Sequence, residues 1–216
     1  MKLVIANWKM NMNLPETTGW LEEFTRMQKN DSLAVEVVIA PPFPYLGEVK
    51  STGLSVGAQD VSALEKGAHT GEVGAFQIKD YCKYCIVGHS ERKEDKAAVL
   101  KKRNACLKAR IIPIVCFVEP ADALDYYADG AVLAWEDPAN ISVGGNYKAK
   151  DPQEIDAEAT FMKKSLPDNA TLVYGGSVNR QNAKELANIV ELDGVLVGNA
   201  SLDPAHFMEI VEAFTL

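Results

Sequence analysis

The chain has 216 residues, 47% hydrophobic and 24% charged, which is enough to bury a large core in a globular protein. Its formal net charge of −8 argues against a broad nucleic-acid-binding surface, although a few local donors can still bind a small anion. No apolar stretch approaches the length of a membrane span, and the run Leu3–Ala6 is too short for a signal peptide. We therefore expect a cytoplasmic protein that binds neither nucleic acid nor membranes.

Short apolar runs recur along the whole chain and predict strands that are buried on both faces, because they are partly β-branched and bounded by Gly, Pro or Asn. They are Leu3–Ala6, Val35–Ala40, Leu54–Ala58, Tyr84–Val87, Ile111–Phe117, Ala131–Trp135, Thr171–Tyr174 and Gly194–Val197. Segments with a helical pattern lie between these strands and after the last one. They are Thr18–Lys29, Pro44–Lys50, Gly74–Asp80, Glu94–Ala109, Ala121–Tyr127, Asp151–Ser165, Asn182–Val190 and Asp203–Phe214.

This strict alternation of strands and helices predicts a parallel sheet. A doubly wound open sheet usually has fewer strands, whereas eight units of about 27 residues favour the closed (β/α)8 barrel, near the short end of its size range. We expect one α/β barrel domain over residues 1–216, with the fifth helix reduced to two turns or fewer because the segment 119–130 is short.

The four cysteines include a C-x-x-C pair, Cys82 and Cys85. A redox or metal role for that spacing needs a second pair or a suitable helix start, and the sequence has neither. The cysteines are therefore predicted to be structural thiols of a protein in a reducing compartment, with no metal site.

Five residues, Gly88-His89-Ser90-Glu91-Arg92, stand between an expected strand and an expected helix. The start of a helix disfavours a second positive charge, so a histidine there is pushed toward its neutral form and can donate a hydrogen bond to a carbonyl oxygen. The alternative is that Ser90 is an ordinary helix N-cap with charged neighbours on the surface. The motif alone does not decide between these interpretations.

Polar residues also follow the carboxyl ends of other expected strands, where a barrel of this kind builds its active site. They are Asn7 and Lys9 after the first strand, His89 after the fourth, Glu136 after the sixth, Gly175-Gly176-Ser177 after the seventh and Gly198-Asn199 after the eighth. Each alone could be a solvated charge or a turn residue, but their agreement on one rim favours a site.

The chemistry of these residues is mutually consistent. Glycine-rich loops after the seventh and eighth strands are the usual phosphate site of such a barrel. Lys9 could neutralise a phosphate or a developing enolate, Glu136 suits a general base in a dry site, and His89 could act as an electrophile on the other side of a substrate. Together they indicate proton transfer beside a carbonyl group.

The sequence resembles the triosephosphate isomerase family along nearly its whole length. The matching segments are Asn7-Trp8-Lys9-Met10, Ala68-His69-Thr70-Gly71-Glu72-Val73, Val87-Gly88-His89-Ser90-Glu91-Arg92, Tyr174-Gly175-Gly176-Ser177-Val178 and Asp193-Gly194-Val195-Leu196-Val197-Gly198-Asn199-Ala200-Ser201-Leu202. The resemblance implies an aldose–ketose isomerase that interconverts dihydroxyacetone phosphate and D-glyceraldehyde 3-phosphate through an enediolate, in glycolysis and gluconeogenesis. It implies no cofactor and no metal.

The resemblance also implies roles for individual residues. Glu136 moves the proton between two carbons, His89 polarises the substrate oxygens, and Lys9 stabilises the enediolate. Asn7 lies near that lysine and Glu91 contacts it. The residues implied for phosphate binding are Ser142, Ser177, Gly198 and Asn199.

A long loop, Gln59 to Thr70, is implied to project into a partner subunit, where Thr70 supports the partner's catalytic asparagine and lysine. This predicts a homo-oligomer, either a dimer or a tetramer. The alternative for so long a loop is a disordered excursion.

The chain departs from the family pattern at two phosphate-binding positions. Ser142 stands where a glycine is expected, in a segment whose Pro138 makes it similar to compact archaeal members. Asn199 replaces a glycine of the eighth loop. Because asparagine tolerates a positive φ angle better than most residues, we expect the phosphate site to survive this replacement at modest cost. These departures keep open a catalytically weakened phosphate-binding barrel or scaffold protein. A pentulose-phosphate epimerase is disfavoured, because no His/Asp ligand set follows the strands.

Overall fold

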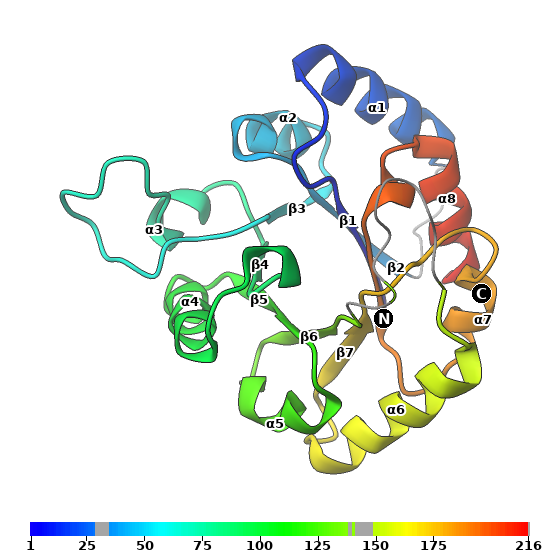
Figure 1. Ribbon diagram of the computed structural model, residues 1–216. Coiled ribbons are helices and arrows are strands. Elements are labelled where there is room, and N and C mark those ends of the chain that lie inside the picture. Colours follow the sequence, from blue (N-terminus) through cyan, green and yellow to red (C-terminus); the bar gives the residue numbers. More distant parts are fainter. Residues whose placement is uncertain (29–34, 138–139, 141–148, 216) are drawn as a thin grey trace.

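A computed structural model describes residues 1–28, 35–137, 140 and 149–215 (Figure 1). Its parallel strands close into a barrel in chain order, with the last strand paired to the first. The strands are β1 Lys2–Asn7, β2 Val35–Ala40, β3 Ser55–Ala58, β4 Tyr84–Val87, β5 Ile112–Phe117, β6 Val132–Trp135, β7 Thr171–Tyr174 and β8 Gly194–Val197. The predicted (β/α)8 barrel is confirmed.

The helices surround the strands as an outer ring (Figure 1). They are α1 Leu14–Met27, α2 Leu46–Ser51, α3 Ala75–Ile78, α4 Lys96–Lys108, α5 Ala123–Tyr126, α6 Pro152–Ser165, α7 Ala183–Ala187 and α8 Pro204–Ala213. The fifth helix is short, as expected. Within the described parts of the chain, none of the helices combines the length and apolarity that a membrane crossing requires.

Several helices begin or end elsewhere than the sequence pattern predicts, because caps rather than apolar spacing fix their ends. Helix α1 begins at Leu14, four residues earlier than predicted: the Asn13 side chain accepts from the Glu16 N–H at 3.0 Å, and the Glu16 carboxylate accepts from the Asn13 N–H at 2.7 Å. Helix α4 begins only at Lys96, because Asp95 is its N-cap and accepts from the Ala98 N–H at 2.7 Å.

The core has two layers, because successive side chains of a strand point to opposite faces. Along β1, Leu3 and Ile5 fill the barrel interior, whereas Val4 and Ala6 pack in the layer between strands and helices. The interior is filled by apolar side chains from all the strands except β3, so it is packed and not a channel. Reacting groups must therefore project from a rim of the barrel.

All four cysteines are buried and free. Burial raises the pKa of the Cys82 thiol to about 12, and it also raises the pKa values of Cys85 and Cys116 well above their usual range. Thiols that stay protonated are poor nucleophiles and behave as small apolar side chains.

A charged group at the amino-terminal end of the barrel makes stability depend on pH. Glu36 of β2 accepts hydrogen bonds from the Lys83 ammonium at 2.5 Å and the Ser55 hydroxyl at 2.9 Å. Burial raises the pKa of Glu36, but hydrogen bonds from Lys83, Tyr84 and Ser55 outweigh burial, so the net pKa is lowered.

We expect Glu36→Gln to destabilise the protein at neutral pH. A carboxyl group whose pKa is lower in the folded state stabilises it above about pH 4.3, and this contribution is lost as the pH falls through the folded value. Urea unfolding of both proteins at neutral and acidic pH measures the effect. A stability difference that is the same at both pH values would contradict the assignment.

Candidate active site

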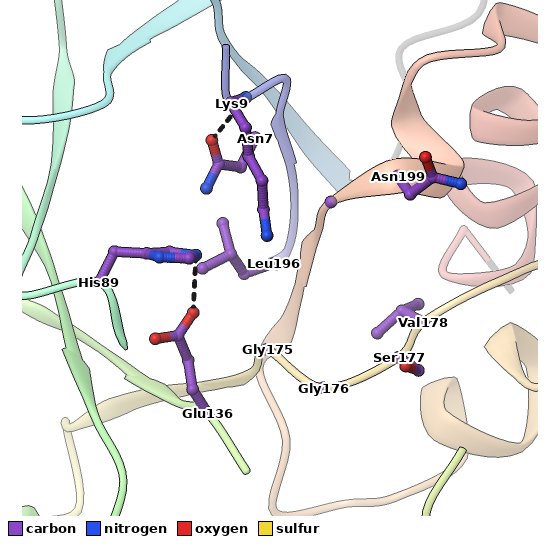
Figure 2. A pocket seen from close by; sticks show the side chains of 11 residues that line it. Asn7, Lys9, His89, Glu136, Gly175, Gly176, Ser177, Val178, Leu196 and Asn199 are labelled. Carbon is purple, nitrogen blue, oxygen red and sulfur yellow. Dashed lines mark hydrogen bonds and ion pairs between the residues drawn. The ribbon is translucent and has the colours of Figure 1, made fainter. Parts of the chain in front are cut away.

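The polar residues that follow five of the strands line one pocket at the carboxyl rim of the barrel (Figure 2). The lining residues are Asn7, Lys9, His89, Glu136, Gly175, Gly176, Ser177, Val178, Leu196, Gly198 and Asn199. Figure 2 shows the side chains of Lys9, His89 and Glu136 extending into the same space. The structure thus brings together the residues that the sequence places on one rim.

His89 follows a turn that requires glycine, since Gly88 has a φ of +74° and a Cβ there would lie 2.6 Å from the Val99 side chain. The Glu91 N–H donates to Nδ1 of His89 at 3.2 Å, so Nδ1 is an acceptor and the proton lies on Nε2. Nε2 is 3.0 Å from a carboxylate oxygen of Glu136. The imidazole is therefore neutral and directs an N–H donor into the pocket.

The alternative interpretation of this motif, in which Ser90 is the helix N-cap, is wrong, because His89 is the N-cap of the 3-10 helix Ser90–Arg92. The Ser90 hydroxyl is buried and has no hydrogen-bond partner among the described residues. Its backbone N–H instead donates to the second carboxylate oxygen of Glu136 at 2.8 Å. The start of this 3-10 helix therefore carries His89, the candidate electrophile, and also binds Glu136, the candidate base.

Glu136 directly follows β6 and is 1% exposed. Its backbone N–H donates to the Phe117 carbonyl at 2.9 Å. A Cβ at position 175 would lie 3.0 Å from Cγ of Glu136, so Gly175 leaves room for the glutamate side chain. The buried carboxylate is hydrogen-bonded through both oxygens, as a buried charge must be.

Lys9 has a φ of +52°, a left-handed conformation that is costly for a lysine. The Asn7 side chain accepts from the Lys9 N–H at 3.1 Å, and the Gln59 amide donates to the Lys9 carbonyl at 2.9 Å. The lysine ammonium lies 2.6 Å from a carboxylate oxygen of Glu91. Asn7 and Glu91 therefore hold the two ends of Lys9. Gln59 was missed in the sequence, because a loop amide carries no periodic signal.

The candidate phosphate-binding residues Ser177, Gly198 and Asn199 line the pocket on the side formed by the loops after β7 and β8. Ser177 is buried, and its hydroxyl donates to the Asn140 carbonyl. A Cβ at Gly198 would lie 3.4 Å from Cε of Lys9, so the loop after β8 passes close to the Lys9 side chain. Ser142 and Pro138 lie outside the described residues.

The reason predicted for Asn199 is wrong. Asn199 begins the 3-10 helix Asn199–Ser201, and it is not among the described residues with a positive φ. Asparagine is accommodated here by ordinary helical geometry, so the replacement of glycine causes no backbone strain at this position.

Thr70 is exposed on the excursion between β3 and α3, which extends away from the barrel in Figure 1. The base of the excursion is closed by a bridge between Ser62 and Gly74, and the Ser62 N–H donates to the Val73 carbonyl at 2.8 Å. Near its tip the Glu72 N–H donates to the His69 carbonyl at 3.1 Å. The excursion is therefore hydrogen-bonded rather than disordered, and Thr70 does not line the pocket of its own chain.

Comparison with known proteins extends over the whole barrel. The family described as "Triosephosphate isomerase" matches residues 2–214. Triosephosphate isomerase of Alkalilimnicola ehrlichii is 34% identical over 249 aligned residues, covering 98% of this chain and 97% of the relative. That of Aquifex aeolicus is 33% identical, covering 99% of both chains, and that of Thermus thermophilus is 33% identical, covering 97% of both. The alignments are longer than this chain, so the relatives carry segments that it lacks. The chain belongs to the triosephosphate isomerase family.

Proposed function

We propose that this isomerase interconverts dihydroxyacetone phosphate and D-glyceraldehyde 3-phosphate by proton transfer through an enediolate, without a cofactor. The observation that carries the proposal is the meeting of a buried carboxylate, a neutral imidazole donor and an ammonium group in one pocket of a chain that belongs to this family. These groups are a base, an electrophile and a charge that stabilises an oxyanion.

In the proposed reaction, Glu136 takes a proton from the hydroxyl-bearing carbon of dihydroxyacetone phosphate. The electron pair of the broken C–H bond forms the carbon–carbon double bond, and the carbonyl oxygen becomes negative. His89 donates its Nε2–H to the substrate oxygens, and the Lys9 ammonium stabilises the negative charge. His89 gives its Nε2 proton to the negative oxygen and takes the proton of the neighbouring hydroxyl in return, so the negative charge moves to that oxygen. Glu136 then returns its proton to the carbon that carried the carbonyl group, and the negative oxygen becomes the carbonyl of the aldehyde.

The contact between His89 and Glu136 supports this assignment, although the two groups must part for the reaction. Their distance of 3.0 Å leaves no place for a substrate oxygen between them. A bound carbonyl replaces the glutamate as acceptor for the Nε2–H and leaves the carboxylate to meet the carbon. Until then, the contact keeps the histidine proton on the nitrogen that faces the substrate.

We assign the substrate phosphate to the part of the pocket formed by Ser177, Gly198 and Asn199, with Ser142 as a further ligand. This assignment is supported by the position of Gly198 beside the Lys9 side chain, because the ammonium group offers charge complementary to a phosphate. No observation favours a catalytically weakened binding or scaffold barrel.

Incubation of the purified protein with dihydroxyacetone phosphate in deuterated water tests the proposal. We expect glyceraldehyde 3-phosphate to form, with deuterium at the carbon that receives the proton, because the proton held by the Glu136 carboxyl exchanges with deuterated water before it is returned. NMR spectroscopy follows both. Tight binding of 2-phosphoglycolate without any turnover would instead favour the scaffold interpretation.

We also infer that the protein works in the cytoplasm as a homodimer, or as a tetramer made of two such dimers, in which Thr70 of one chain supports Asn7 and Lys9 of the other. The exposed position of Thr70 on a hydrogen-bonded excursion supports this inference. A threonine that projected into solvent would need no such ordered support.

Replacement of Thr70 by arginine is expected to dissociate the oligomer and to lower kcat at dilute enzyme concentration, since a bulky charge cannot enter a packed partner site. Light scattering measures the mass against the 23.6 kDa chain, and turnover is assayed in parallel. Asn188→Arg, at an exposed position after α7, is the matched control. A monomeric wild-type protein, or Thr70→Arg with wild-type mass and turnover, would contradict the inference.

A further inference from the structure

An ion pair joins two residues that stand thirteen positions apart, on either side of a segment that begins directly after Glu136. The Lys150 ammonium lies 3.1 Å from a carboxylate oxygen of Asp137, and the two side chains are only 17% and 21% exposed. Asp137 follows Glu136, and Lys150 precedes Asp151, the N-cap of α6. The pair thus joins the end of β6 to the beginning of α6.

The Lys150 ammonium has a second partner, the indole ring of Trp135, whose centroid is 5.1 Å away. That ring has two contacts of its own: its N–H donates to the Val118 carbonyl at 3.0 Å, and it packs against the tilted ring of Tyr174 at 5.4 Å between centroids. The ammonium is therefore held between a carboxylate and an aromatic ring.

These contacts restrict the backbone on both sides of Glu136. On its amino-terminal side, the Trp135 carbonyl accepts from the Gly175 N–H at 2.8 Å, and the Glu136 N–H donates to Phe117 at 2.9 Å. After Glu136 the chain leaves β6, and the side chain of the next residue is held by Lys150. The glutamate therefore lies between a fixed strand end and a fixed ion pair.

The ion pair also acts through charge. Asp137 places a second carboxylate directly beside the buried Glu136, and like charges that are close together favour protonation of one of them. Lys150 neutralises Asp137. Support of α6 does not account for the contact, since that helix already has Pro152 in its first turn and an Asp151 side chain that accepts from Gln153 at 2.8 Å.

We propose that Asp137 and Lys150 are positioning residues for the isomerisation, which hold the backbone of Glu136 at the end of β6 while its side chain moves from His89 to the substrate, and which keep the neighbouring carboxylate neutralised. The proposal rests on the proposed function, in which Glu136 is the base. A misplacement of a reacting group by about 1 Å can lower the rate a hundred-fold, so loss of the ion pair at the residue next to Glu136 is expected to lower kcat.

Kinetics of Lys150→Met, Asp137→Asn, the double variant and Lys150→Arg test the proposal. We expect each of the first two to lower kcat about ten-fold with little change in KM, and the double variant to lose no more than either single one. Lys150→Arg should keep most of the activity, because arginine also pairs with a carboxylate and stacks on an aromatic ring. Only Lys150→Met should move the acid limb of the kcat profile to higher pH, since it alone removes the cation while the Asp137 carboxylate keeps its charge.

The control is Lys163→Met, which breaks an ion pair with Asp193 at 2.8 Å near the opposite end of the barrel; the lysine is 18% exposed, close to the 17% of Lys150. It should lower the thermal midpoint but leave kcat and its pH profile unchanged. Additive losses in the double variant, or a Lys150→Met enzyme with wild-type kcat and pH profile, would overturn the positioning role while the function stands. A wild-type enzyme that does not turn over dihydroxyacetone phosphate would overturn both.

Discussion

Glu136→Gln is expected to lower kcat for both substrates about a thousand-fold, because an amide cannot accept the proton that a positioned carboxylate removes. The amide oxygen can still accept a hydrogen bond from the Ser90 N–H or from His89, which are the partners of the carboxylate in this structure. We therefore expect KM to change little and the barrel to remain folded.

Steady-state assays in both directions measure this effect, with circular dichroism to confirm the fold. Glu185→Gln, on the exposed surface of α7, is the matched control and should behave as the wild type. Equal rates for the wild type and Glu136→Gln would remove Glu136 from the reaction, and a different base would have to be found in the pocket.

Lys9→Met is expected to lower kcat/KM by about three orders of magnitude, because loss of one preorganised donor at a developing oxyanion costs about a hundred- to a thousand-fold and the substrate phosphate also loses a cation. The structure adds a second reason. Glu91, which pairs with Lys9, has its other carboxylate oxygen 3.7 Å from Nδ1 of His89. Without the lysine, this carboxylate favours a proton on Nδ1 and so disturbs the neutral imidazole.

The two contributions to the Lys9 effect can be separated. Glu91→Gln in the Lys9→Met background should recover part of the lost kcat, because it removes the carboxylate that acts on His89, but it should not restore KM. Lys184→Met, on the exposed side of α7, controls for loss of a lysine elsewhere. If Lys9→Met kept the wild-type kcat/KM, the assigned role of the lysine would be wrong.

The arrangement of the strands could be predicted because a buried parallel strand needs an apolar side chain at nearly every position, as in Val132–Trp135. Helix ends were less predictable. At Asn13 a capping box extends the first helix beyond its apolar stripe, and at Asp95 a cap delays the fourth, so hydrogen bonds of single side chains overrode periodicity.

The members of the candidate site and the contact of Glu91 with Lys9 were predictable, but the other contacts of the site were not. The positions of Lys9, His89 and Glu136 follow from the rule that strand ends share a rim, which a sequence pattern can use. The remaining contacts join residues that are not neighbours in the chain. They are the contact of His89 with Glu136, the support of Lys9 by Gln59 and the pairing of Asp137 with Lys150. Their partners depend on side-chain directions that only the folded barrel fixes.

The pairing of β8 with β1 determines when the site is completed during synthesis of the chain. The Leu3 N–H donates to the Asp193 carbonyl at 2.8 Å, and this seam sets Gly198 beside Lys9. The first and last strands are thus neighbours in the barrel, although nearly the whole chain separates them. During synthesis on the ribosome, a nascent chain with every other strand in place still lacks one wall of its pocket, so catalytic competence arises only when the final strand emerges and the barrel closes.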